Sequence, residues 1–483
     1  MSSTDEHVHP TRDNRVLRAL SPVVGGPVGP RAGRGARLGV LGVLLAVTAL
    51  TVALGMLARS ACATDDWSGG TAGDARLCTS DVAAGYVGGG LAELAWPWGD
   101  DSGTSGRYPD ADWDERPPLV GVVAWASAHV THLVVGSPDV DARYSVAPSR
   151  LGDDPDVLHE RGVLVAVVAV LWAWLAMLAV LALAQVHRRR PWDAAAFAAA
   201  PVLALAGLVS WDLLAVALAA GALLAWVRGR AVLAGLALGA GVAAGMWPAL
   251  LLPALVLDAV RRGRRAELGP LLLSGVGAFV VACLPAALSS PGRFLDSWST
   301  MAGRGPEAGT VWAVLDQAFG LPGVVVPVAW ALVAVWCLLV LLAGAVAPRP
   351  PRVEQTVLLL LAGAVLLRTT YDPWQAVWLL PFAALALPRW RDQLVWQGGE
   401  VLHLALYWWW VGGYLQPGGS GAAGFYWVGV LAHVLGTCWL VALVLRDVLD
   451  PRHDLLAAER DPVESAAEAA GQETTTASND VVV

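Results

Sequence analysis

Ionisable and amide side chains in the short polar stretches between long apolar runs are the residues of this sequence that could do chemistry. Most of them stand beside tryptophan or proline. Charged groups at the edge of a hydrocarbon layer are costly, so they usually mark a site or a pathway. The sequence therefore predicts a single cavity at one membrane boundary, built from Asp81, Glu115, Asp212, Arg304, Glu307, Asp372 and Gln375.

Asp81 is the strongest of these candidates. It lies in the stretch LCTSDVAAGYVGGG, residues 77–90, shortly after the first long apolar run. No apolar run follows it, so we expect it to have no helix to cap. Two other carboxylates have structural alternatives. Asp212 in SWDLL could cap the helix that it starts, and Asp372 in YDPW could be the Asx residue of a turn.

Two further patterns also have both a functional and a structural interpretation. The run DADWDE contains Asp110, Asp112, Asp114 and Glu115, and its Asp-x-Asp spacing could bind a divalent cation. A solvated acidic loop is the simpler interpretation, which the sequence favours. His403 has apolar neighbours in EVLHLALYWWW, so it is either a core histidine or part of the site.

The composition identifies the class of protein. The chain has 483 residues, 56% of them hydrophobic, with a mean hydropathy of +0.56. Repeated apolar runs of about 18 residues or more are typical of polytopic membrane proteins and exclude an ordinary soluble domain. All 32 basic residues are arginine. No basic face accompanies aromatic residues outside the apolar runs, which argues against nucleic-acid binding.

The alternation of apolar runs and arginine clusters predicts the topology. Arginine-rich turns are expected on the cytoplasmic side. We therefore predict an all-α, polytopic transmembrane bundle over 36–450, between disordered cytoplasmic tails at 1–35 and 451–483, in the cytoplasmic membrane. About twelve spanning helices are expected, over 36–57, 161–185, 193–209, 212–227, 231–246, 248–260, 267–287, 323–346, 354–369, 374–388, 397–414 and 424–445.

The first external loop, 58–160, is long and acidic. It contains a further apolar segment at 117–136. If that segment spanned the membrane, the HRRR that ends the next run would face outward, so we predict an interfacial or re-entrant helix with His129 and His132 on its polar side. Cys62 and Cys78 in the same loop could form a disulfide if the loop faces an oxidising compartment.

Six blocks in chain order resemble those of glycosyltransferase family 87 in the GT-C superfamily, which includes polyprenyl-phosphate-mannose-dependent mannosyltransferases. The resemblance runs from about residue 36 to 455. Two residues differ from the family's usual pattern, because Met246 stands in place of a lysine and Ser210 in place of an asparagine. The blocks are CTSD (78–81), ERPPL (115–119), SWDLL (210–214), GMWP (245–248), RGPE with GTVW (304–312), and YDPWQ before WLLP (371–381).

The resemblance implies a GT-C fold and an inverting sugar transfer. The donor would be a polyprenyl-phosphate sugar, with mannose the family's usual sugar, and the acceptor a hydroxyl of a lipid or glycan in the cell envelope. No cofactor is expected, and nothing in the sequence requires a metal, so metal dependence stays open. Asp81 is the expected catalytic base, and Arg304 is expected to stabilise the leaving phosphate. The expected substrate-binding residues are Glu115, Arg116, Trp211, Asp212, Trp247, Arg304, Glu307, Tyr371, Asp372, Gln375 and His403.

Two other classes of function stay open. One is a transporter or lipid flippase, and the other is a catalytically inactive scaffold for envelope assembly. A transporter is expected to carry ionisable groups near the bilayer midplane on broken helices. The ionisable groups in this sequence are predicted at one surface, which favours the enzyme.

Overall fold

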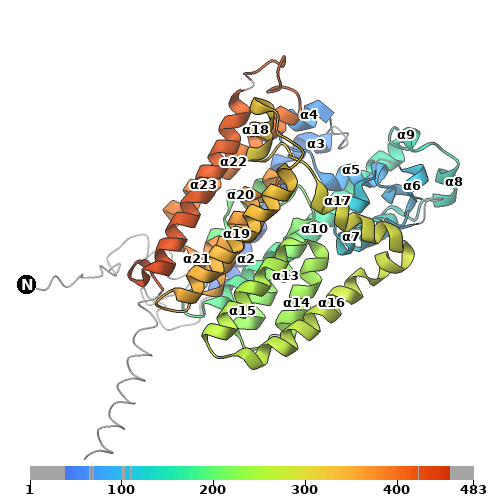
Figure 1. The fold of residues 1–483 in the computed structure, drawn as a ribbon. Helices are drawn as coiled ribbons and strands as arrows, with labels where there is room; N and C mark the ends of the chain where they lie inside the picture. Colours follow the sequence, from blue (N-terminus) through green and yellow to red (C-terminus); the bar gives the residue numbers. More distant parts are fainter. Residues whose placement is uncertain are drawn as a thin grey trace, which may run out of the picture.

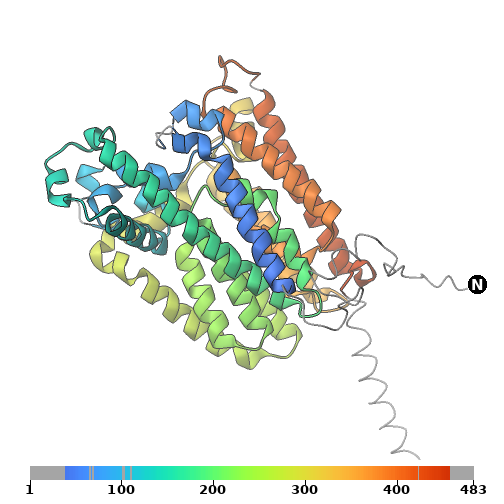
Figure 2. The ribbon, with the colours of Figure 1, turned by 180° about the vertical axis from the view of Figure 1, so that it is seen from behind.

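The computed structural model describes residues 39–64, 67, 70–99, 104–108, 111–422 and 424–456. All regular elements within these residues are helices, as predicted (Figures 1 and 2). The predicted tail at 1–35 and the chain beyond 456 lie outside the described residues. The described structure extends past the predicted boundary at 451, because residues 451–456 are placed and contact the bundle. They include η7 (Pro451–His453) and Asp454, whose Oδ1 lies 3.1 Å from Nη2 of Arg352.

Long apolar helices form the frame of the described structure. Six of them are long and apolar enough to cross a membrane, which is compatible with a helical membrane protein. They are α2 (Val40–Ala58), α7 (Pro118–Val135), α10 (Pro155–Val186), α16 (Leu268–Ser289), α19 (Val325–Val346) and α23 (Gly424–Leu449).

Shorter helices fill the bundle between the long ones. They are α13 (Asp212–Val227), α14 (Ala231–Ala244), η4 (Trp247–Leu250), α15 (Leu251–Arg261) and α20 (Val353–Leu367). Helix α22 (Trp390–Val411) has 22 residues but is not among the six helices that are apolar enough to cross. Helix α20 is buried over most of its length. Because length and composition alone do not establish a crossing for these helices, the count of twelve spans stays a prediction.

Two of the predicted spans are not continuous helices. The segment 193–209 consists of η3 (Pro191–Ala194), α11 (Ala195–Ala198) and α12 (Pro201–Leu205), and 374–388 consists of η6 (Pro373–Trp378) and α21 (Leu380–Ala386). Proline causes the first break. Ala200 is extended, with φ −72° and ψ 125°, as expected for a residue before proline.

A buried arginine stabilises the broken helix. Arg59, at the end of α2, is 1% exposed and donates to the carbonyl oxygens of Ala204 (3.2 Å) and Leu205 (2.6 Å). The last carbonyls of a helix have no partner inside the helix and carry a partial negative charge, so a cation at this place is favourable. Thr51 of α2 also donates to Ala198, at 2.7 Å.

Helix α7 has a different direction from its neighbours. It contacts α10, α14 and α16, and in Figure 2 it is seen nearly along its own axis, whereas α2 and α10 run across the picture. This arrangement is compatible with an interfacial helix, but α7 is also long enough to span, so its interfacial location stays a prediction. His132 is not on a polar face, because it is buried with its Nε2 3.2 Å from the hydroxyl of Tyr86.

Short helices gather at one end of the bundle. Many of them belong to the first loop: α3 (Ser60–Thr64), α4 (Gly70–Ala75), α5 (Asp81–Gly88), η1 (Leu91–Glu93), α6 (Thr104–Arg107), η2 (Asp112–Glu115), α8 (Val140–Tyr144) and α9 (Pro148–Leu151). They are joined there by α17 (Pro291–Gly303) and α18 (Val311–Phe319). Cys62 and Cys78 form a disulfide with a Cα–Cα distance of 5.7 Å. In Figure 1, α3, α4 and α18 lie at the end opposite α15 and α21.

Candidate functional site

Two adjoining cavities lie beneath the short helices. The first, which we call the polar cavity, has a volume of about 310 Å³. It brings together eight of the predicted site residues: Asp81, Glu115, Arg116, Trp211, Asp212, Arg304, Asp372 and Gln375. The structure therefore brings these residues together from distant parts of the sequence.

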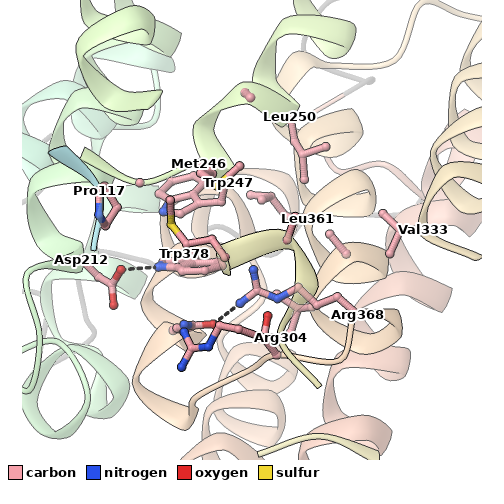
Figure 3. A pocket seen from close by; sticks show the side chains of 18 of the residues that line it. Pro117, Asp212, Met246, Trp247, Leu250, Arg304, Val333, Leu361, Arg368 and Trp378 are labelled. Atoms are coloured by element: carbon pink, nitrogen blue, oxygen red, sulfur yellow. Dashed lines mark hydrogen bonds between the residues drawn. The ribbon is translucent and has the colours of Figure 1, made fainter. Parts of the chain in front are cut away.

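The second cavity, which we call the apolar groove, has a volume of about 330 Å³. Its walls come from the start of η4 and from α17, α19 and α20, with side chains that include Met246, Trp247, Leu250, Met301, Trp330, Val333, Leu361 and Val365 (Figure 3). The two cavities share Glu115, Pro117, Asp212, Arg304 and Gln375 as lining residues. Charged groups therefore stand where an apolar groove meets a polar cavity.

The first loop is attached directly to the start of α13. Ser80 Oγ donates to the carbonyl of Val209 at 3.2 Å, and the amide of Asp81 donates to the same oxygen at 3.1 Å. Asp81 Oδ2 lies 3.7 Å from Nη1 of Arg116. The expectation that no helix follows Asp81 is wrong, because Asp81 is the first residue of α5. The N-cap of α5 is Ser80, whose Oγ accepts from the amide of Val82.

Asp212 does not cap α13. That helix has no side-chain cap, and the Asp212 carboxylate instead accepts from Ser210 Oγ at 2.5 Å and from Trp378 Nε1 at 2.9 Å. Trp378 stacks on Trp247 with ring centroids 5.7 Å apart. The guanidinium of Arg368 lies 4.8 Å from the centre of the Trp378 ring. The indole of Trp378 thus lies between the carboxylate of Asp212 and the guanidinium of Arg368 (Figure 3).

Asp372 does not form an Asx turn either. It precedes η6 without a side-chain cap, and its Oδ1 accepts from the hydroxyl of Tyr407 at 3.3 Å. Burial raises the pKa of Asp372 to about 7, and the negative charges of Glu307 and Asp81 act in the same direction. Asp372 is therefore a carboxyl group that changes charge near neutral pH.

The loop that carries Arg304 and Glu307 is fixed against the turn that carries Asp372. Arg304 Nη2 pairs with Glu307 at 2.7 Å and with Glu115 at 3.2 Å. The amide of Glu307 donates to the carbonyl of Thr369 at 2.9 Å. Burial is also the main cause that raises the pKa of Glu307. Arg304 thus forms ion pairs with two carboxylates at the border between the cavities.

Arg368 is a site residue that the sequence interpretation missed. It lines the apolar groove, donates to Gln375 and makes no ion pair among the described residues. Its Nε atom is buried without a hydrogen-bond partner. A signal for it was present, because Arg368 stands in the turn RTTYDPWQ, which is predicted to be external, where orientation in the membrane does not require an arginine.

Two predicted site residues lie elsewhere. Tyr371 and His403 are fully buried and line neither cavity. Tyr371 donates to Glu400 Oε2 at 3.2 Å, and His403 stacks on His433. Their predicted contact with substrate in the cavities is therefore not supported. Asp110 and the side chains of Asp112 and Asp114 lie outside the described residues. Trp247 and Glu307, by contrast, line the apolar groove as part of the site.

Comparison of the sequence with protein-family models gave no match, and comparison with curated proteins gave none. The functional interpretation therefore depends on the geometry described above and on the resemblance of the six blocks.

Gly309 allows a close approach that a substitution can test. A Cβ atom at this position would lie 1.8 Å from the carbonyl oxygen of Tyr371, so Gly309→Ala must push the two loops apart. We expect a loss of about 1–3 kcal/mol in stability, measured as a lower melting temperature in detergent. Gly305→Ala is the matched control, since nothing lies within 4 Å of its added Cβ. Equal melting temperatures for the two variants would contradict the described contact.

Proposed function

We propose that the chain is a membrane glycosyltransferase of GT-C type. It moves a sugar, mannose in the family that the sequence resembles, from a polyprenyl-phosphate donor to an acceptor hydroxyl at the outer face of the cytoplasmic membrane. The acceptor is a lipid or glycan of the cell envelope. In this proposal the bundle has about twelve spans, and α7 is the interfacial helix.

One observation carries the proposal. An apolar groove joins a cavity rich in carboxylates, and residues including Asp212, Arg304 and Gln375 line both. A polyprenyl-phosphate sugar has the matching chemistry, because its chain is apolar, its phosphate is anionic and its sugar is polar. In the proposed binding mode the prenyl chain lies along the apolar groove, the phosphate lies at the border and the sugar lies in the polar cavity.

Two features support an outward orientation of the cavity. The Cys62–Cys78 disulfide lies only three residues before Asp81 in sequence, and disulfides persist in oxidising compartments. Arginines cluster at the other end of the bundle, where Arg352, Arg389 and Arg446 surround Asp447 and Asp454. Such clusters favour the cytoplasmic side.

The proposed reaction is a single displacement with Asp81 as the base. Asp81 takes the proton of the acceptor hydroxyl while the hydroxyl oxygen forms a bond to the anomeric carbon. The bond from that carbon to the phosphate oxygen breaks, and its electron pair leaves with polyprenyl phosphate. Attack from the face opposite the leaving group inverts the anomeric centre.

Arg368 is the better candidate for the leaving phosphate than Arg304. Arg304 already pairs with two carboxylates, whereas the charge of Arg368 has no ion-pair partner among the described residues. The planar guanidinium fork suits phosphate oxygens. Met246, which stands where the family has lysine, lines the same groove as Arg368. Arg368 thus compensates for the missing lysine from another helix end.

A second candidate function, a transporter, is favoured by one observation. Glu400, His403 and His433 form a fully buried ionisable cluster within α22 and α23, away from the helix ends. Buried ionisable groups at such depth often belong to a transport pathway. The enzyme remains the better account of the polar cavity with its adjoining groove.

The main test is transfer of labelled sugar from polyprenyl-phosphate donors to extracted envelope lipids and glycans. Asp81→Asn keeps the size of the side chain and removes the base. We expect transfer to fall by about 10²–10⁴-fold. Asp141→Asn, at an exposed position of the same loop, should retain wild-type transfer. Full activity of Asp81→Asn would contradict the role of Asp81 as the base. Movement of the donor across the membrane without sugar transfer would favour the transporter.

The charge of Asp372 predicts how donor binding depends on pH. With a pKa of about 7, Asp372 is neutral below that pH and negative above it. The negative form repels the donor phosphate, so we expect the donor KM to rise by about tenfold between pH 6 and pH 8, which corresponds to about 1.4 kcal/mol. Asp372→Asn should abolish this rise. An unchanged pH profile in that variant would contradict the assignment.

A paired substitution tests the phosphate contact. We expect Arg368→Gln to lower kcat/KM for the donor by about ten- to a hundredfold, since a charge-assisted hydrogen bond to phosphate is lost. Met246→Lys, added to Arg368→Gln, should restore part of the activity, because the lysine enters the same groove. Met246→Leu in the same background is the control and should restore none. Equal activity of the two double variants would exclude this role.

A further inference from the structure

A second cluster of polar residues lies inside the bundle, apart from both cavities. Glu400 and His403 are three residues apart on α22, so their side chains share one face of that helix. His433 faces them from α23. Their side chains are buried, with exposed fractions of 1%, 0% and 2%. One ligand atom from each lies within 4.8 Å of those of the other two.

His403 is the residue of this cluster whose ring nitrogens indicate a ligand. Both of its ring nitrogens are buried, and neither has a hydrogen-bond partner among the described residues. The ring stacks against His433 with centroids 5.1 Å apart and against Tyr371 with centroids 6.0 Å apart. Buried polar atoms in folded proteins are nearly always paired, so an orphaned histidine beside a carboxylate indicates a ligand.

The carboxylate of Glu400 is held in place by donors from three directions. Trp396 Nε1 donates to Oε1 at 2.8 Å, Thr437 Oγ1 donates to Oε1 at 3.1 Å, and the hydroxyl of Tyr371 donates to Oε2 at 3.2 Å. Nδ1 of His433 lies 2.9 Å from both oxygens. Metal-ligating carboxylates are commonly oriented by such outer hydrogen bonds.

We propose that Glu400, His403 and His433 bind one divalent transition metal ion, with zinc as the expected metal. Two imidazoles and one carboxylate are a ligand set that zinc accepts, with a fourth position for water. Zinc lies about 2.0–2.2 Å from such ligands, so the three side chains must close in on the ion by small rotations. To bind the ion through Nδ1, the neutral ring of His433 carries its one hydrogen on Nε2.

The proposed ion would tie α22 to α23 and to the turn that carries Asp372. Tyr371, which contacts Glu400, directly precedes Asp372 in the chain. The alternative without a metal is an ion pair between Glu400 and His433 with a neutral His403 packed beside it. The proposal does not depend on the glycosyltransferase function, because metal binding is measured without donor or acceptor.

Metal content tests the proposal on the full chain in detergent, purified with an affinity tag that contains no histidine or cysteine. The protein is stripped with a chelator, dialysed against ZnCl₂ or CoCl₂ and assayed for bound metal. We expect about one equivalent in the wild type and under about a tenth of an equivalent in His403→Ala, since two remaining ligands bind far more weakly. His159→Ala, which removes an exposed histidine, is the matched control and should bind like the wild type.

A second measurement does not require any variant to fold. X-ray absorption at the zinc edge of the loaded wild-type protein should report nitrogen and oxygen ligands at about 2.0–2.2 Å with the scattering of two imidazoles. Cobalt-loaded protein should show the visible absorption of a four-coordinate site. Failure to retain metal, sulfur ligands at the zinc edge, or equal metal content in wild type and a folded His403→Ala would each overturn the proposal.

Discussion

The candidate site depends on one backbone oxygen, the carbonyl of Val209. It accepts hydrogen bonds from Ser80 Oγ and from the amide of Asp81, and it thereby fixes the first loop beside Asp212. That oxygen lies in the turn between the end of α12 and the start of α13 at Asp212. Helix α12 ends at Leu205, and a helix end leaves carbonyls without partners. Arg59 takes two of these carbonyls, those of Ala204 and Leu205, and Val209 follows four residues later in the turn that leads to α13.

Charge balance distinguishes the two cavities. Four carboxylates and two arginines line the polar cavity, whereas Arg368 lies on the apolar side with the Trp378 ring between it and Asp212. Burial is the main cause that keeps the pKa of Asp372 high enough for it to be partly neutral near pH 7, and the negative charges of Glu307 and Asp81 act in the same direction. Arg368 therefore lies on the groove side of a continuous space whose shared border holds Glu115, Asp212 and Arg304, and Glu307 adds a further carboxylate to the groove.

Much of the fold and part of the site could be predicted from the sequence. Apolar runs mark helices well, and alternating runs bring distant turns such as those at Asp81 and Asp372 to one end. Hydropathy does not reveal chain breaks, so the pieces around Pro201 were missed. The directions of the Tyr371 and Asp372 side chains could not be predicted from the sequence either. Asp372 is extended, with φ −105° and ψ 140°, and successive side chains of extended backbone point to opposite sides. Asp372 therefore faces the cavity while Tyr371 faces Glu400, although the two are adjacent.

The burial of Arg59 has a consequence for how the protein is made. Its acceptors in α12 lie about 145 residues further along the chain, so they are synthesised much later than α2 itself. Until they emerge from the ribosome, a charged guanidinium at the end of the first hydrophobic helix has only its own helix and water to receive its hydrogen bonds. Leaving such a charge in hydrocarbon is costly. The contacts of Arg59 with Ala204 and Leu205 therefore form only after the segment around Pro201 has been synthesised.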